Sequence, residues 1–283
     1  MHNSRRSALV ACILAIALPT AAGCGSSPPG RATSTATPSA EASDTAARVF
    51  SFDFDDLPGT NETEVLASGA LALRNAGSEL FEVKVSTRAG GTLRSVPDPE
   101  GGRALRFPVF AALNPKGAVL TATTSSVTDP LAPGVSDFSF GADFNLDEVS
   151  EGALDNGNNL MQRGLSADPV QYKLQIDQGR ASCRVAGEDG EVVVRAEQVI
   201  EPKTWYTLTC TRRGEQVTLE LGIVGGSAEP SIDVGATGGI YLSSEVPIVL
   251  GGKADGAGVV IGGDSDQFNG VIDNAFLEID EEP

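Results

Sequence analysis

An alternation of apolar and polar residues from Asp137 to Leu146 constrains the fold more than any other feature of the sequence. Every second position in this run is apolar, namely Phe138, Phe140, Ala142, Phe144 and Leu146. Successive side chains of a β-strand point to opposite faces, so this spacing predicts a strand with one dry face and one polar face. A dry face needs a second layer to cover it, which favours a layered β-structure.

Similar patterns recur along the chain, and no segment longer than about ten residues shows helical periodicity. Turn-forming residues such as Asp189 and Gly190 separate the runs. An immunoglobulin-type sandwich uses about 7 to 9 strands in about 100 residues, which is too short for this chain. We therefore predict an all-β fold, a two-sheet antiparallel jelly-roll sandwich. Its strands are expected at residues 49–54, 81–86, 104–110, 118–124, 137–146, 172–176, 192–196, 205–212, 217–223, 240–250 and 271–279.

The N-terminal segment has the parts of an export signal. Two arginines precede the apolar run Ala8–Leu18, which is too short to span a bilayer. The segment ends in Ala21-Ala22-Gly23-Cys24, which resembles the lipobox of bacterial lipoproteins, in which the cysteine is acylated. The resemblance implies a signal peptide over residues 1–23 and a lipid anchor on Cys24 at the outer face of the bacterial cell membrane. The alternative is an ordinary signal peptide cut near Ala22, with no anchor.

Residues 24–47 are rich in Ser, Pro, Thr and Ala and carry no apolar periodicity. Such a composition buries too little surface to offset the entropy of ordering, so we predict a disordered tether. No comparable break interrupts residues 48–283, which we predict to form one domain.

Charge, histidine and cysteine content exclude several functions. The formal net charge of −18 gives the chain no electrostatic means of holding nucleic acid. Its only histidine is His2, inside the predicted signal, which excludes Ser-His-Asp and Cys-His catalysis and His-ligated zinc as they are usually built. Cys12 leaves with the signal and Cys24 is the expected lipid site, so Cys183 and Cys210 remain and are expected to form a disulfide outside the cell.

From Phe138 onward the order of features resembles a known superfamily. A strand is followed by the Asn156-Gly-Asn-Asn loop, a Cys-bearing strand, Thr204–Arg212 and the closing segment Phe268–Ile279. This order is similar to the laminin G-like (LamG) branch of the concanavalin A-like lectin/glucanase superfamily. The resemblance implies a jelly-roll sandwich in which Trp205 packs in the core and Tyr206 stands on the outer face. Residues 57–135 match no motif and are expected to supply strands of the same sandwich.

Asp273 is the carboxylate of greatest interest. The first and last strands of jelly rolls commonly lie side by side, which would bring Asp273 near Asp53, Asp55 and Asp56. Calcium prefers six to eight hard oxygen ligands, often from two or three carboxylates and backbone carbonyls. A structural calcium ion at the termini is therefore one expectation, and the alternative is that Asp273 caps a loop.

Two further groups of polar residues are candidates for binding or catalysis. Asp155, Asn156, Asn158 and Asn159 can coordinate calcium or sugar hydroxyls, although such a run is also typical of a tight turn. The segment Glu278-Ile279-Asp280-Glu281-Glu282 fits the Glu-x-Asp-x-Glu pattern of retaining glucanases in the superfamily, which need two carboxylates about 5 to 5.5 Å apart. Its position at the chain end and the scarcity of aromatic residues argue against catalysis.

These observations favour a non-catalytic binding or adhesion module whose ligand is a glycan or a cell-envelope protein. The alternatives are a carbohydrate-active enzyme, a glycoside hydrolase or lyase using Glu278, Asp280 and Glu282, and a passive envelope protein with no ligand. A rigid β-scaffold places recognition on its loops in many folds, which supports the first hypothesis.

Overall fold

The computed structural model describes residues 46–57, 62–65, 81–111, 115–124, 126, 128–149, 158–261 and 266–280. All of them lie in the unit formed by Asp44–Pro283, and each regular element in these ranges is a β-strand. The predicted signal peptide, Cys24 and the tether up to residue 45 lie outside the described residues, whereas Ala46 and Ala47, predicted to end the tether, are the first residues of a strand that pairs with the C-terminal strand. Within the described part, no helix has the length and hydrophobicity that crossing a membrane requires.

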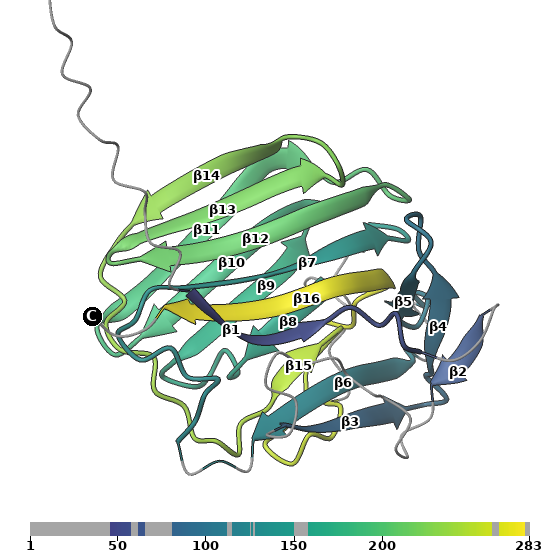
Figure 1. The fold of residues 1–283 in the computed structure, drawn as a ribbon, viewed down its shortest axis with the longest axis horizontal. Coiled ribbons are helices and arrows are strands. Elements are labelled where there is room, and N and C mark those ends of the chain that lie inside the picture. The colour runs from purple at the N-terminus through teal and green to yellow at the C-terminus, as the bar shows by residue number, and fades with distance from the viewer. Residues whose placement is uncertain are drawn as a thin grey trace, which may run out of the picture. The chain divides into compact units, whose positions relative to one another are not determined.

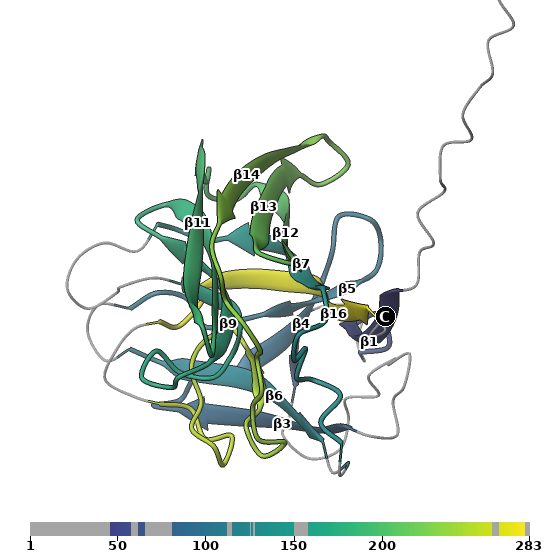
Figure 2. The same cartoon turned by 90° about the vertical axis from the view of Figure 1, so that its left-hand side faces the viewer.

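The strands form two antiparallel sheets that pack face to face (Figures 1 and 2). The larger sheet has the order β14 (Ala228–Val234), β13 (Gln216–Ile223), β12 (Trp205–Arg213), β7 (Phe138–Leu146), β16 (Gly270–Asp280), β5 (Arg103–Arg106), β4 (Leu93–Pro97) and β2 (Thr63–Val65), and β1 (Ala46–Phe52) also pairs with β16. The smaller sheet has the order β11 (Gly190–Val199), β10 (Arg180–Gly187), β9 (Gln171–Asp177), β8 (Asn158–Arg163), β15 (Ile248–Leu250), β6 (Gly117–Thr124) and β3 (Phe81–Arg88). The predicted all-β, two-sheet sandwich is therefore confirmed.

The core lies between the sheets and is built from the apolar faces of the strands. In β7, Phe140 and Phe144 are fully buried, as the alternation predicts. Phe140 meets Tyr172 of β9 edge to face with 5.1 Å between ring centroids, and Phe144 stacks on Tyr206 at 5.6 Å. Each such aromatic pair adds about 0.5 to 1.5 kcal/mol beyond the area it buries.

The predicted disulfide between Cys183 and Cys210 is present and joins the two sheets. Cys183 lies on β10 of the smaller sheet and Cys210 on β12 of the larger sheet, with 6.1 Å between their Cα atoms. Both side chains are fully buried in the core.

Residues 57–135 supply strands β2 to β6, so they belong to the sandwich as expected. The predicted strand over residues 240–250 is wrong, because only Ile248–Leu250 is a strand. Before it, the Val246 amide donates to the Ser243 carbonyl in a tight turn, and Pro247 has no amide hydrogen to contribute. The buried Arg163 guanidinium then binds the carbonyl oxygens of Val246 and Ser243.

The assignment of Trp205 to the core and Tyr206 to the outer face is also wrong. Tyr206 is 1% exposed and packs in the core, whereas Trp205 is half-buried on the outer face of the larger sheet against Val96, Ala104 and Val271. The reason is strand parity, since Tyr206 lies an even number of residues from the buried Cys210 and shares its face.

Candidate functional site

The outer face of the smaller sheet carries a set of polar side chains in register across three strands. On one row, Lys173 of β9 lies directly between Arg184 of β10 and Gln162 of β8. On the next row, Gln175 of β9 lies between Ser182 and Asn159. We call these residues the polar patch: Asn159, Gln162, Lys173, Gln175, Ser182 and Arg184.

A bulge in β8 makes this arrangement possible. The register shifts between Asn159 and Met161, so Asn159 and Gln162 face the same side although they are three residues apart. The Asn159 Nδ2 amide donates to Gln162 Oε1 over 2.9 Å, which fixes both amides. Asn159 is 0% exposed, and its Oδ1 atom accepts no hydrogen bond from any described residue. A buried acceptor without a donor costs about 1 to 3 kcal/mol, which makes this part of the patch unusual.

Three ion pairs surround the centre of the patch. The Arg184 guanidinium binds Glu191 with 2.6 Å between Nη2 and Oε2. Lys253 pairs with Asp266, and Arg195 pairs with Asp177. Each pair is neutral as a whole, so the pairs leave no net charge at the rim.

Lys173 differs from these cations because its ammonium has no ion-pair or hydrogen-bond partner among the described residues. Burial, with a further contribution from the positive charges of Lys253 and Arg184, lowers the pKa of Lys173 to about 8, while Asp177 acts in the opposite direction. Among the described residues, the patch therefore holds one positive charge that is partly desolvated and has no ion-pair partner.

The patch is bounded on one side by an apolar cluster and on the other by a cavity. Val249 of β15 continues the row beyond Gln162 and packs with Val119, Ala254 and Val260. At the opposite end, a cavity of about 490 Å³ lies between the edge strands β11 and β14. Its lining includes Val193, Arg195, Glu229, Ile232 and Asp233. Figure 2 shows these two strands near each other at the edge of the layers.

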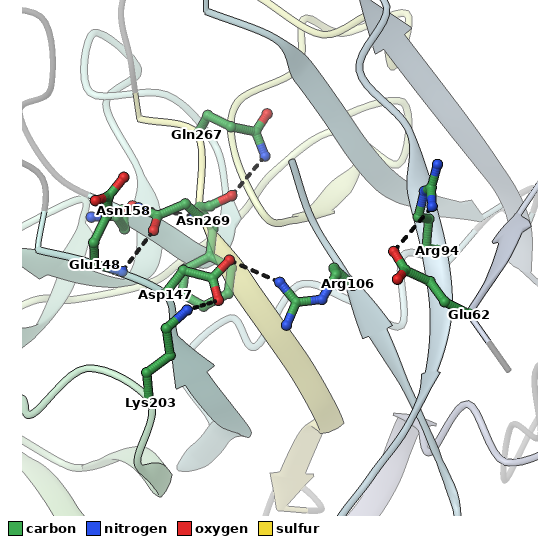
Figure 3. Close-up of polar contacts among 10 residues, drawn as sticks. Glu62, Arg94, Arg106, Asp147, Glu148, Asn158, Lys203, Gln267 and Asn269 are labelled. Atoms are coloured by element: carbon green, nitrogen blue, oxygen red, sulfur yellow. Dashed lines mark hydrogen bonds and ion pairs between the residues drawn. The ribbon is translucent and has the colours of Figure 1, made fainter. Parts of the chain in front are cut away.

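The predicted ligand-binding residues separate into different environments. Asp155 and Asn156 lie outside the described residues. Asn158 begins β8 on its inner face and is 2% exposed, and its Oδ1 atom accepts hydrogen bonds from the Nδ2 and backbone amides of Asn269 at 2.7 and 3.3 Å (Figure 3). Asn269 Oδ1 in turn accepts from the Glu148 amide. Asn158 thus links three segments of the sandwich, and only Asn159 of the group belongs to the polar patch.

The predicted metal residues lie on the other sheet. The first and last strands do lie side by side, because β1 pairs with β16 along residues 46–52 and 275–280. Asp273 projects from the outer face of β16 directly opposite Asp143 of β7. Here a bulge in β16 places Asn274 at a φ of 48°. The backbone amide of Asn274 donates to the Asp273 carboxylate at 2.8 Å, and its side-chain amide donates to the Asp143 carboxylate at 2.9 Å.

A small cavity of about 20 Å³ adjoins Asp273, and its lining includes Asp98, Glu100, Asp143 and Trp205. Burial, with smaller contributions from the negative charges of Asp98, Asp143 and Asp55, raises the pKa of Asp273 to about 8, while the hydrogen bond from the Asn274 amide acts in the opposite direction. Asp98 and Asp143 were not identified from the sequence. Asp143 is on the polar face of the alternating run, which was the available signal for it.

Asp55 and Asp98 converge at Gly102, where a Cβ atom would collide with both carboxylates. Asp53 accepts a hydrogen bond from the Asp55 amide at 3.3 Å, and Asp56 is exposed. Among the described residues, no three acidic, histidine or cysteine side chains are close enough to hold a metal ion by themselves. The donor atoms of the cluster are all oxygens, the type that calcium prefers, and a calcium ion would need backbone carbonyls or water to complete its shell.

The candidate catalytic residues lie at the end of β16. Glu278 lies opposite Ser139 and Asp280 opposite Ala46, both half-buried. Glu282 lies outside the described residues. Neither Glu278 nor Asp280 lines the two cavities described above.

No protein-family model matches the sequence, and no curated protein is similar to it. Solved structures are similar in fold. The binding domain of botulinum neurotoxin serotype G gives a TM-score of 0.52 at 12% identity, over 82% of this chain and 47% of that one. The binding domain of Paraclostridial Mosquitocidal Protein 1 gives 0.50 at 12% identity, over 79% and 49%. The chain thus spans about half the length of these toxin domains.

Domain 4 of AbnA, a GH43 extracellular arabinanase from Geobacillus stearothermophilus solved in complex with arabinotriose, gives a TM-score of 0.51 at 12% identity. Here the alignment covers 84% of this chain and 94% of that domain. The chain shares this fold. At such low identity the likeness extends to the β-sandwich alone, so function has to be argued from the chain's own residues.

Proposed function

We propose that the protein is a non-catalytic, glycan-binding module of the laminin G-like type, held at the outer face of the bacterial cell membrane by a lipid on Cys24. The polar patch is the observation that carries this proposal. Its half-buried members, Lys173, Gln175 and Arg184, carry groups that hydrogen-bond to sugar hydroxyls, and a rigid sheet holds them in two rows beside the buried side chains of Asn159, Gln162 and Ser182. The arabinotriose complex of AbnA domain 4, which has nearly the same extent, supports a saccharide as the ligand class.

The cavity lies beside the patch on the neighbouring strand. Val193 and Arg195 line the cavity and also lie in register with Arg184 and Ser182 of the patch. The only Trp of the sequence, Trp205, is on the other sheet, so no tryptophan ring next to the patch can stack on the sugar rings of a long chain. A short saccharide or a glycan end, held by hydrogen bonds, fits the surface best.

Binding of the full-length protein to a panel of neutral and acidic glycans, measured by isothermal titration calorimetry, tests the proposal. We expect Gln175→Ala to weaken binding about 5- to 10-fold through loss of one or two hydrogen bonds. Gln216→Ala is the matched control, because Gln216 is an exposed residue of β13 in the other sheet, and this variant should bind like the wild type. Absence of binding to every glycan, or release of reducing sugar that Glu278→Gln abolishes, would contradict the proposal.

The lipid anchor is tested separately. Cys24→Ser should move the protein from the membrane fraction to the medium, because a stable anchor depends on the acyl chains. Retention of this variant in the membrane fraction would disprove anchoring through Cys24.

We also propose a structural calcium ion next to Asp273, with Asp55 and Asp98 as further ligands. The convergence of two carboxylates on Gly102, beside a third that is desolvated among like charges, supports this assignment. A bound divalent cation would offset that repulsion and tie β16 to the segment after β1.

A further inference from the structure

The charge balance of the polar patch points to the chemistry of its ligand. Arg184, Arg195 and Lys253 are each neutralised by an acidic partner, whereas Lys173 at the centre has none among the described residues. Lys173 is half-buried, so water compensates its charge only in part. An anionic group of the ligand is the missing partner.

The groups next to Lys173 identify the rest of the ligand. Gln162 lies opposite Lys173, but it is only 2% exposed and its Oε1 atom accepts the Asn159 amide, so it forms part of the buried base of the patch. Gln175 is on the same face one row away and is half-buried. Amide donors and acceptors about one row from an ammonium match a molecule that carries both a carboxylate and hydroxyl groups.

We propose that the polar patch selects an acidic sugar, whose carboxylate binds the Lys173 ammonium while its hydroxyls bind the amide of Gln175. This inference rests on the proposed glycan-binding function and names its substrate class. The net charge of −18 makes the site distinctive, because most of the surface repels anions and only a local uncompensated cation attracts one.

The pH dependence of binding follows from the groups that face Lys173. These are Arg184 on β10, Lys253 on the loop after β15 and Asp177 on β9. In the free protein, Lys173 is charged below its pKa of about 8 and neutral above it. Affinity for an acidic sugar should therefore be constant below about pH 7 and fall by up to about tenfold per pH unit above pH 8.

Titration of the full-length protein with trigalacturonate and with the neutral arabinotriose tests the inference. We expect trigalacturonate to bind more tightly, and Lys173→Met to weaken it about 10- to 100-fold, as expected for loss of a charge-assisted hydrogen bond. Lys84→Met is the matched control, because Lys84 lies on the same face of the sheet on edge strand β3, where it is exposed and pairs with Glu82. Lys173→Arg should retain binding and lose the fall above pH 8, since arginine stays charged.

The outcomes distinguish the inference of an acidic sugar from the glycan-binding function on which it rests. Selective binding of trigalacturonate that depends on Lys173 supports the inference. Binding of arabinotriose alone, or of trigalacturonate with equal affinity in Lys173→Met, overturns it and leaves the glycan-binding function intact. Binding of neither sugar overturns the inference, and failure of the whole glycan panel overturns the function as well.

Discussion

Removal of the Cys183–Cys210 bridge gives a sharp test of the sandwich, because the bond crosses from one sheet to the other. The two cysteines close a loop of 27 residues that contains all of β11. The chain-entropy relation assigns such a loop about 3.5 kcal/mol of stabilisation at 25 °C, through restriction of the unfolded chain. Each Cys→Ala substitution also removes a fully buried sulfur, which costs roughly another 1 kcal/mol.

These terms predict a specific pattern in a double-mutant cycle. Cys183→Ala and Cys210→Ala should each lower the free energy of unfolding by about 4.5 kcal/mol, since either one breaks the bridge. The double variant should lose about 5.5 kcal/mol rather than the sum of the single losses, because the bridge can be lost only once.

Urea unfolding, followed by far-ultraviolet circular dichroism and by the fluorescence of the single Trp205, measures all four proteins. Dithiothreitol added after unfolding should lower the stability of the wild type only. Additive losses in the cycle, or equal sensitivity of the variants to dithiothreitol, would refute the bridge as a constraint between the sheets.

Three further predictions concern the core and the proposed calcium site next to Asp273. Asp129→Ala should lower the free energy of unfolding in urea by about 3 to 5 kcal/mol. It removes the carboxylate that lies 2.6 Å from the guanidinium of Arg163, a side chain that is 0% exposed, and leaves a buried charge without its partner. A loss below about 1 kcal/mol would show that the charge is not buried. Gly141→Ala should cost about 1 to 3 kcal/mol, since its Cβ would lie 2.6 Å from the Leu208 carbonyl oxygen, and unchanged stability would contradict that close approach. Calcium at 100 times its dissociation constant should stabilise the wild type by about 2.7 kcal/mol in thermal unfolding and leave Asp273→Asn unaffected; equal stabilisation of both proteins would exclude Asp273 as a ligand.

The architecture could be predicted because it follows from local patterns in the sequence. The alternation in Phe138–Leu146 specifies which face of β7 is buried, and one remaining pair of cysteines permits one connectivity. Where local signals conflict, the prediction failed. Trp205 was assigned to the core from the laminin G-like resemblance, but its parity relative to Cys210 places it on the outer face. Ile240–Leu250 is apolar enough for a strand, yet a turn and a buried arginine interrupt it.

The candidate sites could be predicted only in part, because they depend on pairings between distant segments. The alternation of Tyr172, Leu174 and Ile176 already places Lys173 on the outer face of its strand. It does not reveal that Gln162 and Arg184 flank it, since strand register is a non-local property. The same holds for Asp98, which reaches the Asp273 cluster from the turn after β4.

The two candidate sites lie on the outer faces of different sheets, and this separation bears on their roles. Asp273 is next to the pairing of β1 with β16, so the proposed ion would act on the attachment of the terminal strands and hence on stability. The polar patch is on three inner strands of the other sheet, β8, β9 and β10, whose positions are fixed by the core and by the disulfide on β10. A rigid surface of this kind loses little conformational entropy when a ligand binds, so its few hydrogen bonds and one unpaired charge can supply affinity without any change in the sandwich.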